Sequence, residues 1–147
     1  KWSEYRVYIQ NWTTSMNTKR FILVDDDMFN NNLCKMYIQY VYPTMEIVDF
    51  TLPERGFEYL KSEFTVGEAT PAILLLDINM PTMTGWDFLE KYEELDQRVK
   101  EQISIYILSS SVDPRDKEKA DNNKYVKGYL EKPLQVDVIK KISQEIN

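Results

Sequence analysis

The stretch AILLLDINMPTMTGWDFL, residues 72–89, decides how this chain is expected to fold. Its first five residues are apolar and lead directly into Asp77, and Pro81 and Gly85 follow within eight positions. A short, wholly apolar run is typical of a strand that is buried on both faces of a parallel sheet. A carboxylate at the end of such a strand is costly to bury unless a charged partner meets it. Asp77 is therefore expected to be a strand-ending cap, a metal ligand or a nucleophile.

The rest of the chain alternates short apolar runs with helical patterns. Strands are predicted at residues 21–24, 45–50, 72–76, 103–108 and 125–130. Helices are predicted at residues 29–40, 53–64, 85 to about 98, 113–122, and in a closing segment with apolar positions 138, 139, 142 and 146. Five strands alternating with five helices indicate an α/β fold in three layers, a parallel sheet covered on both faces.

The composition of the predicted strands indicates their order in the sheet. The first, third and fourth are nearly all apolar and should be central, whereas the second and fifth alternate with polar residues as edge strands do. The order 2-1-3-4-5 satisfies both conditions and is the doubly wound, flavodoxin-like (βα)5 arrangement. We expect residues 18–147 to form this domain. Residues 1–17, rich in aromatics but without clean periodicity, are expected to be an N-terminal extension, either an ordered arm or a loose tail.

Composition excludes several classes of protein. The chain contains no histidine, which removes Ser-His and Cys-His nucleophilic pairs, His-rich zinc sites and a phosphohistidine carried by this chain. The net charge of −6 argues against an extended nucleic-acid surface. No stretch approaches the ~18 apolar residues of a membrane span, and the N-terminus lacks a signal-peptide pattern. The single cysteine, Cys34, is expected to be a small core or boundary residue and favours a reducing compartment, the cytoplasm.

Polar side chains stand at the ends of four of the five predicted strands. Asp25 and Asp26 follow the first strand, Asp77 the third, Ser109 the fourth, and Lys132 the fifth. In a sheet of this order, ligands bind beyond the carboxyl ends of the strands, where the winding reverses between the first and third. We therefore expect these five residues to converge at one edge of the sheet.

The acidic residues at this edge indicate a site for a hard divalent cation, Mg²⁺ or Mn²⁺. Carboxylates within a few ångströms repel one another, and such a cation removes the conflict while keeping several of its waters. Asp26 and Asp77 are expected to bind it directly, Asp25 through water, and the backbone carbonyl of Asn79 as a further ligand. Asp27 is expected instead to cap the helix that follows.

Asp77 is then the candidate nucleophile. A carboxylate can attack a phosphoryl group to form an acyl phosphate, and a bridging metal neutralises the developing charge. The positive charge of Lys132 and the hydroxyl of Ser109 would bind the other phosphoryl oxygens. Asp77 is thus interpreted as ligand and nucleophile together.

These residues resemble the receiver domain of two-component response regulators, over about residue 19 to the C-terminus. The motifs that carry the resemblance are ILVDDD (22–27), LLLDINMPTMTGWDFL (74–89), ILSSS (107–111) and GYLEKPL (128–134). The resemblance implies that Asp77 is the phosphoacceptor and that Asp25 and Asp26 are the acidic pair around Mg²⁺. It also makes Ser109 the conformational-switch hydroxyl and Lys132 the lysine that contacts the phosphate.

The resemblance implies further features of the site and its partners. Tyr129 would be the rotating switch aromatic, although ordinary edge-strand packing is the alternative, and the bond before Pro133 would be cis. The phosphoryl group would come from a phosphohistidine on a sensor histidine kinase or phosphotransfer protein, and the phosphorylated form would bind a downstream protein. Direct binding to nucleic acid or membrane is not expected, and a weak or phosphorylation-dependent dimer is left open. Because the last predicted helix reaches Asn147, a stand-alone receiver is expected.

Two alternatives belong to other functional classes. Phosphatases of the haloacid-dehalogenase type carry a second Asp two residues after the nucleophile, where this chain has Asn79. A receiver that binds partners without phosphorylation would not need the complete set of site residues that this sequence has. Asn79 and Ser111, two residues beyond Asp77 and Ser109, are expected to tune hydrolysis, and neither is a strong general base. The leading prediction is thus a signalling receiver with slow autodephosphorylation, not an enzyme that turns over a substrate.

Overall fold

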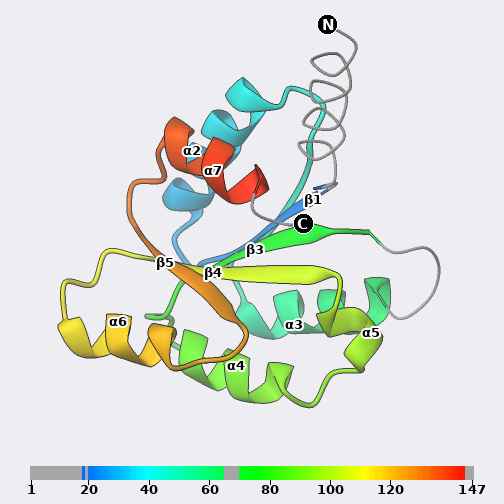
Figure 1. The fold of residues 1–147 in the computed structure, drawn as a ribbon, viewed down its shortest axis with the longest axis vertical. Coiled ribbons are helices and arrows are strands. Elements are labelled where there is room, and N and C mark those ends of the chain that lie inside the picture. The colour runs from blue at the N-terminus through cyan, green and yellow to red at the C-terminus, as the bar shows by residue number, and fades with distance from the viewer. Residues whose placement is uncertain (1–17, 19, 65–69, 145–147) are drawn as a thin grey trace, which may run out of the picture.

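The computed structural model describes residue 18 and residues 20–64 and 70–144, so the predictions for residues 1–17 and for Ile146 lie outside the described residues (Figure 1). This part of the chain holds five strands and six helices. They are β1 (Arg20–Val24), α2 (Met28–Val41), β2 (Glu46–Phe50), α3 (Pro53–Glu63), β3 (Ala72–Leu76), α4 (Gly85–Tyr92), α5 (Gln97–Lys100), β4 (Ile103–Ser109), α6 (Pro114–Asp121), β5 (Val126–Glu131) and α7 (Val136–Gln144). Among the described helices, none has the length and apolar character needed to cross a bilayer.

The five strands form one parallel sheet in the order β2-β1-β3-β4-β5, which confirms the predicted topology and its edge strands. Helices α2 and α7 cover one face, and α3, α4, α5 and α6 lie on the other (Figure 1). Alternate residues of the central strands serve the two faces: Ile22 and Leu74 pack into one core, and Leu23 and Leu75 into the other. Because both faces are covered, β3 is apolar at every position, and β1 and β4 are apolar at most of theirs.

The register of the sheet places the strand ends at one level. Val24 of β1 is the partner of Leu76 in β3, so Asp25 and Asp77 leave the sheet together. The amide of Asp77 donates to the carbonyl of Val24 at 2.9 Å, which continues the ladder one step past the strands. On the other side, the amide of Lys132 donates to the carbonyl of Ser109 at 3.0 Å.

The single helix predicted from residue 85 to about residue 98 was wrong at its C-terminal end. Helix α4 ends at Tyr92, and a separate turn, α5, begins after Asp96, whose backbone is extended (φ −53°, ψ 140°). The Asp96 carboxylate accepts a hydrogen bond from the amide of Arg98, so it caps a new helix instead of continuing the old one. Leu95 and Val99, on either side of Asp96, are both buried.

Candidate functional site

Three carboxylates meet beyond the ends of β1 and β3. One oxygen from each of Asp25, Asp26 and Asp77 lies within 4.8 Å of the others. Asp25 and Asp77 are buried, with 4% and 5% of their surface exposed, whereas Asp26 is exposed. The cluster is therefore closed at its base and open to solvent through Asp26.

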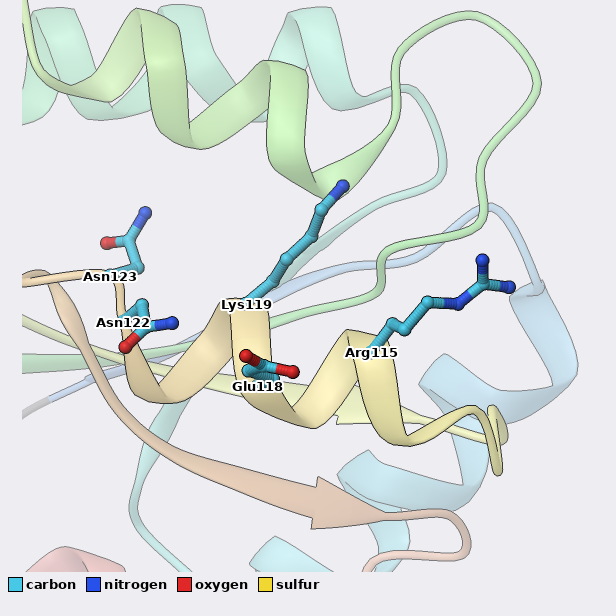
Figure 2. A pocket seen from close by; sticks show the side chains of 5 residues that line it. All are labelled: Arg115, Glu118, Lys119, Asn122 and Asn123. Atoms are coloured by element: carbon cyan, nitrogen blue, oxygen red, sulfur yellow. The ribbon is translucent and has the colours of Figure 1, made fainter.

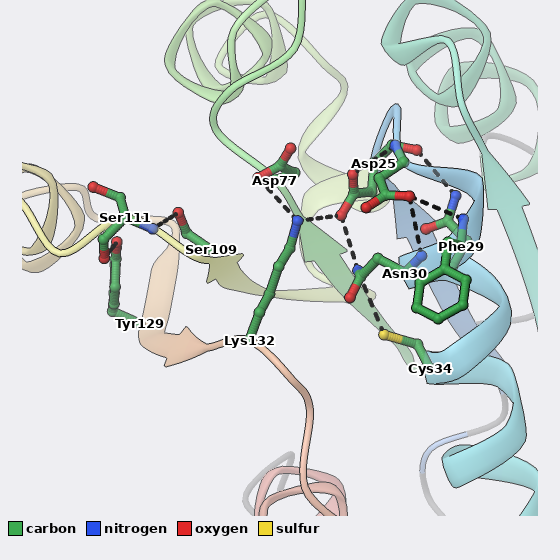
Figure 3. A network of polar contacts seen from close by, with 11 residues as sticks. Asp25, Phe29, Asn30, Cys34, Asp77, Ser109, Ser111, Tyr129 and Lys132 are labelled. Atoms are coloured by element: carbon green, nitrogen blue, oxygen red, sulfur yellow. Dashed lines mark hydrogen bonds and ion pairs between the residues drawn. The ribbon is translucent and has the colours of Figure 1, made fainter.

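Lys132 supplies the positive charge at the base of this cluster. Its Nζ lies 2.7 Å from Asp25 Oδ2 and 3.6 Å from Asp77 Oδ1, and it points between the two carboxylates (Figure 3). The peptide bond between Lys132 and Pro133 is cis. Burial lowers the pKa of Lys132, but its hydrogen bond to Asp25 and the two carboxylate charges outweigh burial and raise the pKa overall. Lys132 is therefore held in its charged form.

The pKa of the Asp77 carboxyl group is raised, chiefly because the group is buried. Burial, and then the charge of Asp25, raise its pKa from 3.8 to about 6. Lys132 and hydrogen bonds from the backbone amides of Asn79 and Ile78 act in the opposite direction without cancelling the rise. A second positive charge beside Asp77 would restore an ordinary carboxylate, and three carboxylates with retained water are the oxygen ligands that Mg²⁺ prefers. The residues present thus fit the expected cation, and the predicted ligand role of the Asn79 carbonyl stays a prediction.

The first turn of α2 also holds Asp25, through hydrogen bonds to its carboxylate and its backbone. Asn30 Nδ2 donates to Asp25 Oδ2 at 2.9 Å, and Asn31 Nδ2 donates to the backbone carbonyl of Asp25 at 3.0 Å. Asp27 caps α2 as predicted, accepting from the amides of Phe29 and Asn30. Its own amide donates to Asp25 Oδ1 at 2.9 Å, so both carboxylate oxygens of Asp25 are engaged.

Sequence reasoning missed Asn30 and Asn31. In the sequence they belong to the polar run Asn30-Asn31-Asn32, which has the composition of an exposed helix surface. The available signal was spacing: Asn30 precedes the buried residues Cys34 and Ile38 by four and eight positions, so it shares their face of the helix. Cys34 is buried as predicted, and burial raises the pKa of its thiol to about 12.

Ser109, Ser111 and Tyr129 form a second group on the β4 side of the sheet (Figure 3). The hydroxyl of Ser109, which is fully buried, accepts a hydrogen bond from the amide of Ser111 at 3.0 Å. The Ser111 hydroxyl donates to Asp116 Oδ2 of α6 at 2.5 Å and accepts from the amide of Asp113. The Tyr129 hydroxyl donates to the carbonyl of Ser111 at 3.1 Å. Ser111 therefore joins Ser109, α6 and β5.

A shallow pocket of about 340 Å³ lies apart from these groups, along α6 (Figure 2). Its lining residues are Arg115, Glu118, Lys119, Asn122 and Asn123. Lys119 Nζ lies 5.4 Å from the ring centroid of Trp86 on α4, so the lysine stem crosses between the two helices. The lining carries charges of both signs and includes none of the strand-end residues, so the candidate site is the carboxyl edge of the sheet.

Two solved structures are similar to this chain in fold and in sequence. A response regulator receiver protein from Dyadobacter fermentans is 27% identical, with a TM-score of 0.77 over 86% of this chain and 96% of that chain. A two-component response regulator from Cytophaga hutchinsonii is 29% identical, with a TM-score of 0.78 over 86% of this chain and 95% of that chain.

A curated relative and a family model agree with these structures. The probable methanogenesis regulatory protein FilR2 of Methanothrix harundinacea is 29% identical over 91 residues, which cover 62% of this chain and 57% of that protein's length. The model of the response regulator receiver domain matches residues 21–144. The chain therefore belongs to the response regulator receiver domain family.

Proposed function

We propose that this receiver accepts a phosphoryl group on Asp77 and, once phosphorylated, changes which protein partner it binds. The observation that carries the proposal is that Asp77 is buried and that the ammonium group of Lys132 lies between its carboxylate and that of Asp25. The donor would be a phosphohistidine on a sensor histidine kinase or phosphotransfer protein. The single cysteine, Cys34, supports a cytoplasmic location for the exchange.

In the proposed reaction, an oxygen of Asp77 attacks the phosphorus atom of the donor. The bond between phosphorus and the imidazole nitrogen breaks, and its electron pair stays on the nitrogen. Asp26 and Asp77, with Asp25 through water and the Asn79 carbonyl, would hold Mg²⁺, which neutralises charge on the phosphoryl oxygens. Lys132 stands within reach of the same region and would bind a phosphoryl oxygen directly.

The proposed switch involves the β4 side of the site. The Ser109 hydroxyl would turn toward a phosphoryl oxygen, and Tyr129, which bonds to the backbone of Ser111, would then rotate. Ser109 already stands at the end of a central strand, next to Lys132 through a backbone hydrogen bond. This connection supports a route from the phosphoryl group to the surface formed by α6 and β5.

The phosphorylated form should persist for minutes or longer. Rapid hydrolysis needs a general base that activates water beside the phosphoryl group, and neither the amide of Asn79 nor the hydroxyl of Ser111 is a strong base. The hydroxyl of Ser111 is in addition bound to Asp116. Slow hydrolysis would suit a signal, and it would count against a phosphatase that turns over its substrate.

Intact mass measurement after treatment with acetyl phosphate and Mg²⁺ tests the proposal. Wild type should gain the mass of one phosphoryl group, Asp77→Asn should gain none, and Asp121→Asn, which changes an exposed carboxylate on α6, should behave as wild type. A gain that survives in Asp77→Asn would refute the assignment, and no gain in wild type would favour a receiver that works without phosphorylation. Steady phosphate release from a phosphomonoester that Asp77→Asn abolishes would instead indicate a phosphatase.

A further inference from the structure

We propose that Asn30 is a positioning residue for phosphorylation: its side-chain amide fixes the Asp25 carboxylate in the orientation that holds Lys132 beside Asp77. This inference rests on the proposed function and extends the site by a residue on α2. Asn30 itself does not touch Asp77 in the hydrogen bonds described above, so it would act through Asp25.

The three donors around Asp25 leave its carboxylate little freedom. Oδ2 receives Asn30 Nδ2 at 2.9 Å and Lys132 Nζ at 2.7 Å, and Oδ1 receives the amide of Asp27 at 2.9 Å (Figure 3). A carboxylate has about four lone-pair positions, so three of them are filled by the protein. The oxygens of Asp25 are therefore largely occupied by Lys132 and the other donors. This fits binding of a cation by Asp25 through water and direct binding of the cation by Asp26 and Asp77.

Asn30 is itself held in place. Only 7% of its surface is exposed, and its amide nitrogen lies 3.7 Å from the buried sulfur of Cys34 one turn further along α2. Its backbone amide is bound by the Asp27 cap at 3.3 Å. The neighbouring Asn31 is 1% exposed, and its side-chain amide donates to the backbone carbonyl of Asp25, which fixes the backbone there. The first turn of α2 therefore acts as a rigid support for Asp25.

An amide suits this position better than the side chains that resemble it. A carboxylate at position 30 would have the same shape but would replace the donor with an acceptor and add a fourth negative charge to a site that has three. A methyl group would leave Asp25 Oδ2 with Lys132 alone, and the carboxylate could then turn. Two substitutions, Asn30→Ala and Asn30→Asp, therefore separate the effect of side-chain shape at position 30 from the effect of its charge.

The two substitutions should act alike on phosphorylation and differently on Mg²⁺. Losing one hydrogen bond to a buried carboxylate should slow phosphorylation by acetyl phosphate about tenfold in both Asn30→Ala and Asn30→Asp. Asn30→Asp should also bind Mg²⁺ several-fold more tightly, because the added carboxylate favours a cation, whereas Asn30→Ala should bind it within about twofold of wild type. A residue with only a structural role would not separate these two quantities.

The experiment measures the phosphorylation rate by intact mass at saturating Mg²⁺, the Mg²⁺ dissociation constant by calorimetry, and the melting temperature of each variant. Asn32→Ala is the matched control, because Asn32 lies on the same turn but is exposed.

Wild-type rates in both Asn30 variants would overturn the positioning role while leaving the proposed function intact. If Asn30→Ala does not fold, Asn30→Asp, which has the same shape, decides the question: a slower rate with tighter Mg²⁺ binding supports the role, and an unchanged rate overturns it. If wild type itself gains no phosphoryl group, the proposed function fails. The Mg²⁺ measurement does not depend on phosphorylation, so an unchanged Mg²⁺ dissociation constant in Asn30→Asp would by itself refute the influence of position 30 on the site.

Discussion

The two halves of the site are built differently. On the β1 side, Asp25 is buried, paired with Lys132 and bound by two further donors from α2 and the turn before it. On the β4 side, Ser109 and Tyr129 each make a single hydrogen bond to the backbone of Ser111, and Tyr129 is only half-buried. The bonds of Ser109 and Tyr129 are neutral, and charge-assisted bonds are about twice as strong, so Asp25 should hold its position while Ser109 and Tyr129 rearrange.

This difference assigns separate tasks to the two halves. Under the proposed function, the β1 side would be arranged before any phosphoryl group arrives, because its charges are already paired and buried. The β4 side is arranged around Ser111, and a turn of the Ser109 hydroxyl toward Asp77 would break its bond to the Ser111 amide. Ser111 also binds Asp116 on α6, so a change at Ser109 would be passed to that helix.

Replacing Lys132 should break the preformed half and give the largest effect. Lys132→Ala removes the charge that faces Asp25 and Asp77, so phosphorylation by acetyl phosphate should slow by about a hundredfold. Two buried carboxylates would lose their partner, and the free energy of unfolding without Mg²⁺ should fall by about 2 kcal/mol. Rates from intact mass and unfolding in urea measure both effects. Lys127→Ala, which changes an exposed lysine on β5, is the control, and a Lys132→Ala rate within threefold of wild type would contradict the account.

The preformed half should also bind Mg²⁺ more weakly in acid. Since the pKa of Asp77 is raised to about 6, a proton competes with the cation below that pH. The affinity for Mg²⁺ should therefore fall by up to about tenfold per pH unit below pH 6 and level off above it. Calorimetric titration between pH 5 and pH 7.5 measures this dependence. An affinity that stays constant across this range would contradict the raised pKa.

The same raised pKa has a consequence for folding. An acid whose pKa is higher in the folded state than in the unfolded state binds more protons when folded between pH 4 and pH 6. Without Mg²⁺, the contribution of Asp77 to the free energy of unfolding should therefore fall as pH rises through this window. Comparison with Asp77→Asn isolates the contribution, because the other carboxylates titrate in both proteins.

Loosening the movable half should give the smallest effect. Asp116→Asn weakens the bond that the Ser111 hydroxyl makes to α6, so the free energy of unfolding should fall by about 0.5–1 kcal/mol. The arrangement that the proposed switch would break is then less stable, and binding of Mg²⁺ with beryllofluoride, which mimics a phosphoryl group, should tighten by about threefold. Calorimetry checks the affinity, with Asp121→Asn as the control. Weaker binding in Asp116→Asn would mean that Asp116 supports the phosphorylated arrangement instead.

Much of the fold and of the site could be predicted from the apolar runs in the sequence and the polar residues that follow them. Apolar runs identify the central strands, and parallel strands bring their carboxyl ends to one edge of the sheet. The sequence alone therefore predicts that Asp25, Asp77 and Lys132 lie close together. The family membership and the sheet order are confirmed. The chemical roles of the individual residues stay predictions.

What could not be predicted depends on side chains that reach across turns. The break in the helix before α5 depends on whether Asp96 caps a new turn, and helical spacing alone does not distinguish a cap from an exposed position. The bond between Ser111 and Asp116 depends on the path of the loop after β4. The role of Asn30 could not be predicted for a different reason. A buried polar residue on a helix is recognised only when its hydrogen-bond partner, here Asp25, is known.

The most direct test of the contrast between the two halves is the NMR spectrum of the protein with Mg²⁺ alone and after addition of beryllofluoride. The account predicts that beryllofluoride shifts the backbone amides of Ser109, Ser111 and Tyr129 strongly, while the side-chain amide of Asn30 keeps its position. Large shifts of Asn30 together with unchanged Ser111 and Tyr129 would contradict the account, because the half described as preformed would then be the one that moves.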